Sequence, residues 1–199
     1  MKRFLSLSFF MMMGTVALAA APETKPQAAP SVAPAAKSEA PVSSLKTYQD
    51  DKNLFRLQYP TKWKVQTPDP KAKNPSPVLV SFAKSDDTAV VSILKAKTDS
   101  ATSAADFLNQ MDQSRKATNQ IPEKMRTLKK EIAAKSKVDD AAVGYYEIAG
   151  QNPVLQRVLS LKKKNEFFVL TGTFQKANEL DEDPLIESIL TSFEIIEKK

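Results

Sequence analysis

The side chains that could do chemistry in this sequence are carboxylates, hydroxyls and lysines, because its 199 residues include no His and no Cys. The chain therefore cannot build a Ser-His-Asp triad, a Cys nucleophile, or a zinc site with imidazole or thiolate ligands. Gly144, Gly150 and Gly172 stand at spacings that match no phosphate-binding loop. Catalysis by carboxylates or by Ser and Lys stays possible, but no candidate pair stands out by spacing. We therefore expect no enzyme and no cofactor.

Three pairs of adjacent aspartates are the first candidates for binding chemistry: Asp50-Asp51, Asp86-Asp87 and Asp139-Asp140. Asp supports turns because its side chain accepts hydrogen bonds from nearby backbone N–H groups. A calcium site would require six or more oxygen ligands from a loop of defined spacing, and none of the pairs shows that spacing. Turn formation is thus the favoured interpretation, and no metal is expected.

A basic segment, residues 115–137, is the strongest functional signal. Its eight basic and two acidic residues give 8 − 2 = +6, which equals the formal charge of the whole chain. A basic face beside an apolar stripe can bind an anionic membrane surface or an acidic protein, although many such faces are merely solvated. Nucleic acid is not expected as a partner, because no aromatic side chain interleaves with these charges to stack on bases. The candidate contact residues are Arg115, Lys116, Lys124, Arg126, Lys129, Lys130, Lys135 and Lys137.

A second candidate site uses aromatic residues. Most aromatic side chains in strand patterns belong to the core, but Tyr59, Trp63 and Tyr146 could line a cleft for a small molecule. Binding of a small ligand is therefore the alternative function.

The first 44 residues fall into two parts. Residues 1–19 have the order of a secretory signal peptide: Lys2 and Arg3, an uncharged apolar run, and a small-residue cleavage site that ends at Ala19. Residues 20–44 are rich in Pro and Ala and are expected to form a disordered linker, or a spacer if the apolar run is retained as an anchor. We expect a periplasmic or secreted protein. Cleavage would remove two positive charges and leave 6 − 2 = +4.

Residues 45–199 are expected to form one domain, and its strands are signalled by apolar patterns. Phe55, Leu57 and Tyr59 alternate with polar residues, as in a strand with one buried face. Pro60 should end this strand, and Trp63 should cap the core. Further strands are predicted at 78–82, 90–96, 142–148, 154–161 and 167–174. The last two are apolar almost throughout, which is typical of strands covered on both faces. The predicted fold is α/β, with a mainly antiparallel sheet sandwiched between helices.

Helices are predicted from capping residues and apolar stripes. Ser103 and Asp106 form a capping-box pattern, and the helix after them should fade near residues 117–119. A short helix is expected up to about Lys130, followed by a strand over 131–138, although the two assignments compete there. The last helix is expected to begin with Asp183 as N-cap and Pro184 at its first position. Its buried stripe should comprise Leu185, Ile186, Ile189, Leu190 and Phe193.

The order of these parts resembles the PsbP-like family, which includes DcrB-type bacterial periplasmic proteins. The matching residues are Phe55, Leu57, Tyr59, Pro60 and Trp63 near the start, and Ile186, Ile189, Ser192 and Phe193 near the end. The similarity spans about residues 48–195, and it implies an α/β/α sandwich around an antiparallel sheet. Photosynthetic members of the family are non-enzymatic subunits of photosystem II. The leading functional hypothesis is therefore an exported accessory module that binds a protein or an anionic surface through residues 115–137.

Overall fold

A computed structural model describes residues 44–52, 54–69, 76–97, 101–113, 118–120, 130–132 and 138–196. All of them belong to the compact unit Ala40–Lys199. The predicted signal peptide and all of the predicted linker except Ser44 lie outside the described residues.

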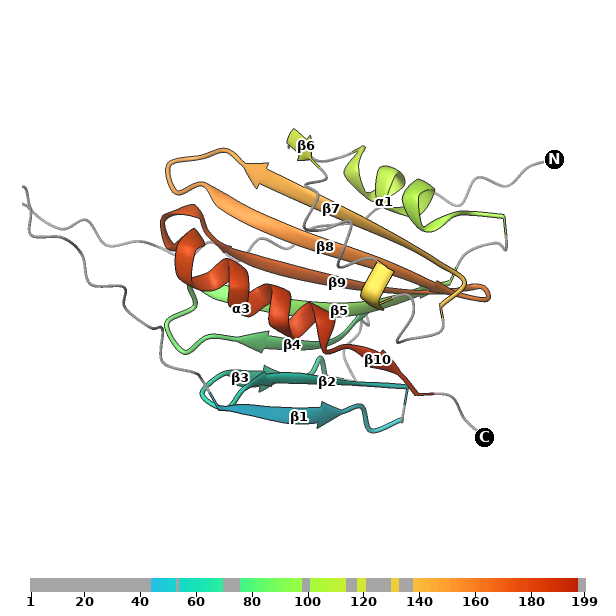
Figure 1. The fold of residues 1–199 in the computed structure, drawn as a ribbon, viewed down its shortest axis with the longest axis horizontal. Coiled ribbons are helices and arrows are strands. Elements are labelled where there is room, and N and C mark those ends of the chain that lie inside the picture. Colours follow the sequence, from blue (N-terminus) through green and yellow to red (C-terminus); the bar gives the residue numbers. More distant parts are fainter. Residues whose placement is uncertain are drawn as a thin grey trace, which may run out of the picture. The chain divides into compact units, whose positions relative to one another are not determined.

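Two antiparallel sheets form the framework of this unit (Figure 1). The larger has the order β3-β4-β5-β9-β8-β7-β6, and the smaller has the order β1-β2-β10. The larger sheet comprises β3 (Lys64–Gln66), β4 (Val78–Ala83), β5 (Ala89–Lys97), β9 (Glu166–Gln175), β8 (Val154–Lys163), β7 (Asp140–Ile148) and β6 (Thr118–Gln120). The smaller comprises β1 (Leu45–Gln49), β2 (Phe55–Pro60) and β10 (Glu194–Ile195). The described helices are α1 (Ala104–Asp112), the 3-10 turn η1 (Lys176–Asn178), α3 (Glu179–Thr191) and three helical residues at 130–132.

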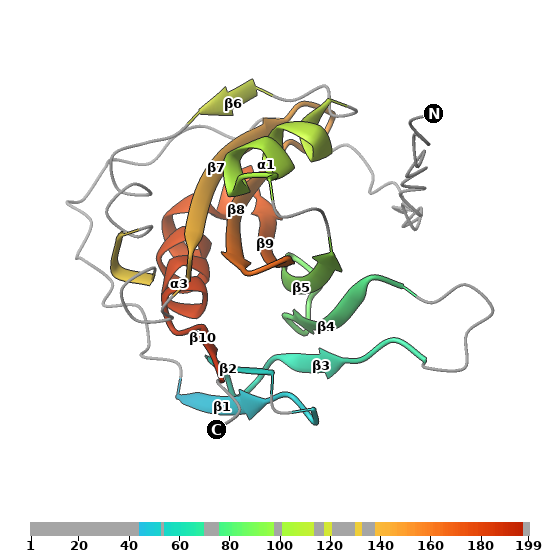
Figure 2. The ribbon, with the colours of Figure 1, turned by 90° about the vertical axis from the view of Figure 1, so that its right-hand side faces the viewer.

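Both faces of the larger sheet are packed, and β9 shows how. Phe168 and Leu170 lie in a core cluster with α3 and β2, whereas Phe167 and Val169 lie in a second cluster with α1. Figure 2 shows α3 and α1 on opposite sides of the sheet. Because successive side chains of a strand point to opposite faces, a strand between two helical layers must be apolar almost throughout. The predicted α/β sandwich around an antiparallel sheet is thus confirmed, with the smaller sheet sharing the α3 side.

The alternation predicted for residues 55–60 is confirmed in β2. Phe55, Leu57 and Tyr59 are buried, and the intervening polar side chains are exposed. Pro60 is the last residue of the strand, and its carbonyl accepts a hydrogen bond from the backbone N–H of Trp63 at 3.0 Å. Trp63 is 5% exposed. The chain therefore turns at Pro60 from the smaller sheet into the larger one.

The predicted hairpins are present, and the strands are longer than expected. β8 and β9 continue through most of the polar segment 162–166, which leaves only Lys164 and Asn165 in the turn. Lys164 adopts a left-handed backbone conformation with φ of 56°. Its N–H donates to Asp139 Oδ2 at 2.6 Å, so a side chain from outside the hairpin supports this tight turn.

Helix α1 begins as predicted but ends early. The Ser103 side chain accepts from the N–H of Asp106, and the Asp106 side chain accepts from the N–H of Ser103, which completes the capping box. The helix ends at Asp112, and Thr118–Gln120 is a strand paired with β7. The prediction of helix up to residues 117–119 was therefore wrong. No apolar residue stands three or four positions after Met111, so the buried stripe stops there.

Two further boundaries differ from the predictions. α3 begins at Glu179, and Pro184 lies inside the helix and not at its first position. The reason is that Glu179 and Asp183 both face Arg157, as residues four apart on one helix face do. Residues 130–132 are helical, so the strand predicted from residue 131 does not begin there, and Ile132 is buried in the core. The rest of that predicted strand, up to 137, lies outside the described residues.

Gly172 sets how closely α3 approaches the sheet. A Cβ atom at this position of β9 would overlap the Cγ2 atom of Ile186 in α3. The substitution Gly172→Ala should therefore lower the free energy of unfolding by about 1–3 kcal/mol through overpacking.

Chemical denaturation of a double-mutant cycle with Ile186→Ala would test this contact. Because Ile186→Ala removes the overlapping methyl group, the loss in the double variant should be smaller than the sum of the two single losses. Additive losses would show that the helix and the strand do not meet at this point.

Candidate functional site

The basic segment lies largely beyond what the structure describes. Lys130 is described and its side chain is exposed. The remaining predicted contact residues lie outside the described residues: Arg115, Lys116, Lys124, Arg126, Lys129, Lys135 and Lys137.

The described parts of this segment show how it is attached. Thr118–Gln120 pairs with Tyr145–Glu147 of β7 and forms the last strand of the larger sheet. Ile132 is 1% exposed and belongs to the core cluster shared with α3. Figures 1 and 2 place the helical residues 130–132, drawn in yellow, on the α3 side of the sheet. The segment is thus fixed at two points, and exposed Lys130 stands two residues from the second.

The three aromatic residues of the predicted cleft are not brought together. Tyr59 and Trp63 lie in the α3-side cluster, and Tyr146 lies in the α1-side cluster. All three are at most 5% exposed. Tyr146 donates a hydrogen bond from its hydroxyl to Asp112 Oδ2 in α1. The sheet therefore separates Tyr146 from the other two, and each side chain serves a core.

The aspartate pairs bind backbone N–H groups. Asp50 Oδ2 accepts from Lys52 N–H at 3.0 Å, and Asp86 Oδ1 accepts from Thr88 N–H at 3.1 Å. Asp140 Oδ2 accepts from Ala104 N–H at 2.7 Å and so supports the first turn of α1. These contacts are the ones that turns and helix starts require.

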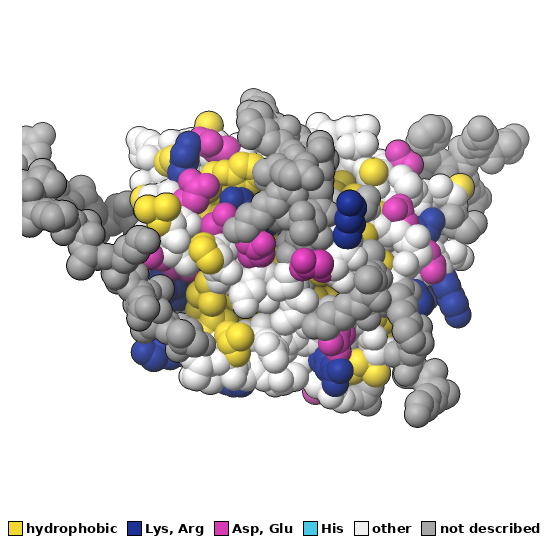
Figure 3. Space-filling view, viewed as in Figure 1, with side chains coloured by type: hydrophobic (Ala, Val, Ile, Leu, Met, Phe, Trp, Pro, Cys, Tyr) yellow, Lys and Arg dark blue, Asp and Glu magenta, His cyan; other side chains and the backbone are white. Residues whose placement is uncertain are grey.

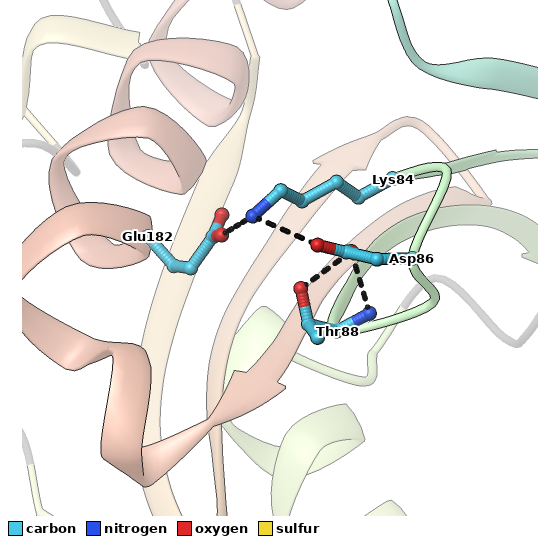
Figure 4. Close-up of polar contacts among 4 residues, drawn as sticks. All are labelled: Lys84, Asp86, Thr88 and Glu182. Atoms are coloured by element: carbon cyan, nitrogen blue, oxygen red, sulfur yellow. Dashed lines mark hydrogen bonds and ion pairs between the residues drawn. The ribbon is translucent and has the colours of Figure 1, made fainter.

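An ionic contact joins α3 to the β4–β5 loop, and no pattern in the sequence indicates it (Figure 4). Lys84 Nζ donates to Glu182 Oε1 at 2.5 Å and lies 3.4 Å from Asp86 Oδ2. The Glu182 side chain is 3% exposed, whereas that of Lys84 is 34% exposed. The hydrogen bond to Glu182 is the main cause that raises the pKa of Lys84. Hydrogen bonding from Thr88 is the main cause that lowers the pKa of Asp86.

A second ionic contact lies under the same end of α3. The Arg157 side chain, on β8, is 7% exposed, and its Nε is 2.9 Å from Asp183 Oδ1. Its guanidinium carbon lies 3.5 Å from the centre of the Tyr145 ring. Burial raises the pKa of Tyr145. The two contacts hold the first turns of α3 to the sheet.

An open groove of about 430 Å³ runs beside α1. Its lining includes Thr102, Asn109, Gln110 and Gln113, which offer hydrogen-bonding groups. Its carboxylate, Asp106, already accepts from the Ser103 hydroxyl at 2.6 Å.

Comparison with solved structures finds similarity of fold alone. No protein-family profile matches the sequence, and no curated protein matches it. The structure is similar to cyanobacterial PsbP (CyanoP) from Synechocystis sp. PCC 6803, at 15% identity and a TM-score of 0.48, covering 81% of this chain and 98% of that one. A protein from Bacteroides thetaiotaomicron VPI-5482 has 13% identity and a TM-score of 0.48, with 77% and 49% covered. PA94 of Pseudomonas aeruginosa, a protein of unknown function, has 11% identity and a TM-score of 0.40, with 78% and 98% covered. Identities this low carry no activity or partner to this chain.

The Lys84–Glu182 contact predicts an asymmetry between two substitutions. Lys84→Met leaves the buried Glu182 carboxylate without its cation, and should cost about 2–3 kcal/mol of unfolding free energy. Glu182→Met leaves a lysine that still reaches solvent and Asp86, and should cost about 1 kcal/mol. Urea denaturation of both variants measures the difference. Equal losses, or a larger loss for Glu182→Met, would contradict the burial of the carboxylate.

The lowered pKa of Asp86 predicts that the free energy of unfolding depends on pH. Its pKa is lower in the fold than its ordinary value of 3.8, so its charge stabilises the protein above that value. The contribution disappears as the pH falls through the lowered pKa. Asp86→Asn keeps the oxygen that accepts from Thr88 and removes the charge, and should cost about 0.5 kcal/mol at neutral pH, since the side chain is exposed. The difference from the unmodified protein should shrink as the pH falls below the ordinary value of 3.8; a difference that stays constant with pH would contradict this account.

Proposed function

We propose that this chain is an exported, non-enzymatic binding module that contacts an anionic partner through residues 115–137. The observation that carries the proposal is charge. The segment holds a net charge of 8 − 2 = +6, as large as that of the whole chain. Concentrated positive charge accelerates and strengthens association with anionic surfaces.

The attachment of the segment supports a role as a contact surface. Backbone pairing of Thr118–Gln120 with β7 and burial of Ile132 tie it to the domain at two points. A segment attached at two points loses less conformational freedom on binding than a free tail does. Lys130, the described member of the set, is exposed.

Composition and side-chain contacts support a role without catalysis. The sequence has no His and no Cys, and the buried charged groups Arg157 and Glu182 are paired with partners of opposite charge. Small-ligand binding between Tyr59, Trp63 and Tyr146 is less supported, because two core clusters divide these residues.

The signal-like residues 1–19 support export to the periplasm or beyond. The motif residues Phe55, Leu57, Tyr59 and Trp63 are all core residues, which fits membership of the PsbP-like family, including its DcrB-type branch, as a matter of architecture. In the described part of the chain, no helix has the length and apolar character needed to cross a bilayer.

Charge reversal in the segment tests the proposal. Lys129→Glu with Lys130→Glu should weaken binding to immobilised poly-glutamate at low salt by at least about tenfold, because favourable contacts become repulsive. Binding of the unmodified chain should also fall steeply as added salt shortens the screening length below about 10 Å.

The matched control is Lys52→Glu with Lys164→Glu, which makes the same change of charge at two exposed turn positions. It should bind nearly as well as the unmodified chain. Equal weakening of both double variants would mean that net charge, and not this segment, governs binding.

A further inference from the structure

A second basic surface lies where the two sheets meet, at the β1–β3 corner, which we define as residues 44–46 and 60–65. Leu45 pairs with Pro60 across β1 and β2. The N–H of Thr61 donates to the Ser44 carbonyl at 2.9 Å, and the hydroxyls of Ser44 and Thr61 lie 2.8 Å apart. Val65 follows on β3, paired with Phe82. These contacts gather both stretches of chain at one end of the strands (Figure 1).

The charge of this corner is entirely positive. Lys46, Lys62 and Lys64 are exposed, and none of residues 44–46 and 60–65 is acidic. Lys46 Nζ lies 4.8 Å from the centre of the Tyr59 ring. By contrast, Lys84 is held by Glu182 and Lys176 by Glu147. Within the described residues, no carboxylate pairs with Lys62 or Lys64.

Exposed aliphatic side chains accompany these lysines. In the described part of the chain, three large apolar side chains count as exposed, and two of them are at this corner: Leu45 at 41% and Val65 at 37%. Dark-blue Lys and Arg side chains are visible at the lower left of Figure 3, on the side of the molecule where β1 and β3 begin in Figure 1. A single exposed aliphatic residue means little, but lysines interspersed with aliphatic residues match the chemistry of a membrane interface.

We propose that the β1–β3 corner docks on a bilayer that contains anionic phospholipids. Because successive residues of β1 and β3 point to opposite faces of their sheets, the corner docks end-on. Leu45 and Val65 supply its apolar contacts, and Lys46, Lys62 and Lys64 reach the headgroups. Lysine is depleted in protein–protein interfaces, whereas its long stem suits a bilayer surface, where the aliphatic part lies against apolar groups and the ammonium reaches the headgroups. This surface is separate from residues 115–137, and it adds a lipid ligand to the proposed function.

Vesicle binding tests the charge contribution. The protein, purified from the compartment to which cells export it, should co-sediment with vesicles of equal parts phosphatidylglycerol and phosphatidylcholine, and not with phosphatidylcholine alone. Lys62→Gln with Lys64→Gln should weaken this binding roughly 30-fold, since each basic residue at an anionic surface contributes about 1 kcal/mol. Lys52→Gln with Lys164→Gln removes the same charge from turns at the other end of the strands (Figure 1) and should leave binding nearly unchanged.

A fluorophore reports which part of the surface enters the bilayer. Because the sequence has no Cys, Leu45→Cys creates a unique position for an environment-sensitive label. Its emission should shift to the blue on anionic vesicles, and the same label at Asn165→Cys, in the β8–β9 turn, should not shift. Two results would overturn the membrane proposal in favour of a general polyanion site. One is vesicle binding with no emission shift at residue 45. The other is a loss of affinity for soluble poly-glutamate, in the variant Lys62→Gln with Lys64→Gln, as large as its loss of affinity for vesicles.

The two basic surfaces are distinguished by their own variants. If Lys129→Glu with Lys130→Glu abolishes vesicle binding while Lys62→Gln with Lys64→Gln has no effect, the corner is not the lipid surface and the role of residues 115–137 stands. Suppose instead that only the corner variant loses vesicle binding, and that Lys129→Glu with Lys130→Glu leaves binding to poly-glutamate unchanged. The corner proposal then stands and the proposed function fails.

Discussion

The structure depends on one strand that serves two cores. In β9, Phe168 and Leu170 pack toward α3 and the smaller sheet, while Phe167 and Val169 pack toward α1. β9 also pairs along its whole length with β5 and β8. Neither helix layer would have a surface to bury against without these alternating apolar side chains, because an antiparallel sheet of ordinary polarity leaves one face to water.

The position of α3 follows from this strand and from charge. Gly172 leaves room for Ile186 to lie against the backbone of β9. Farther toward the helix start, Lys84 and Arg157 hold the carboxylates of Glu182 and Asp183. Apolar contact thus sets the distance of the helix from the sheet, and ionic contact fixes the turns before Pro184.

The sequence predicted what alternation and capping determine locally, such as β2, the β8–β9 hairpin and the Ser103–Asp106 capping box. The start of α3 was missed, because the helix begins before Pro184, where Glu182 contacts Lys84 and Asp183 contacts Arg157. These partners lie about 98 and 26 residues away in the chain. The same distance hid both ionic contacts. Tyr146 was grouped with Tyr59 and Trp63 because composition cannot tell which face of a sheet a side chain occupies.

Native-state hydrogen exchange of the β9 amides tests the two-core account most directly. If β9 supports both layers, the amides of Val169 and Leu170 should exchange only through global unfolding and should be among the slowest in the protein. Their protection should then fall in parallel with the overall free energy of unfolding as denaturant is added. Exchange of these amides at lower free energy than those of β1 and β2 would show that the layers are stabilised independently, and would contradict the account.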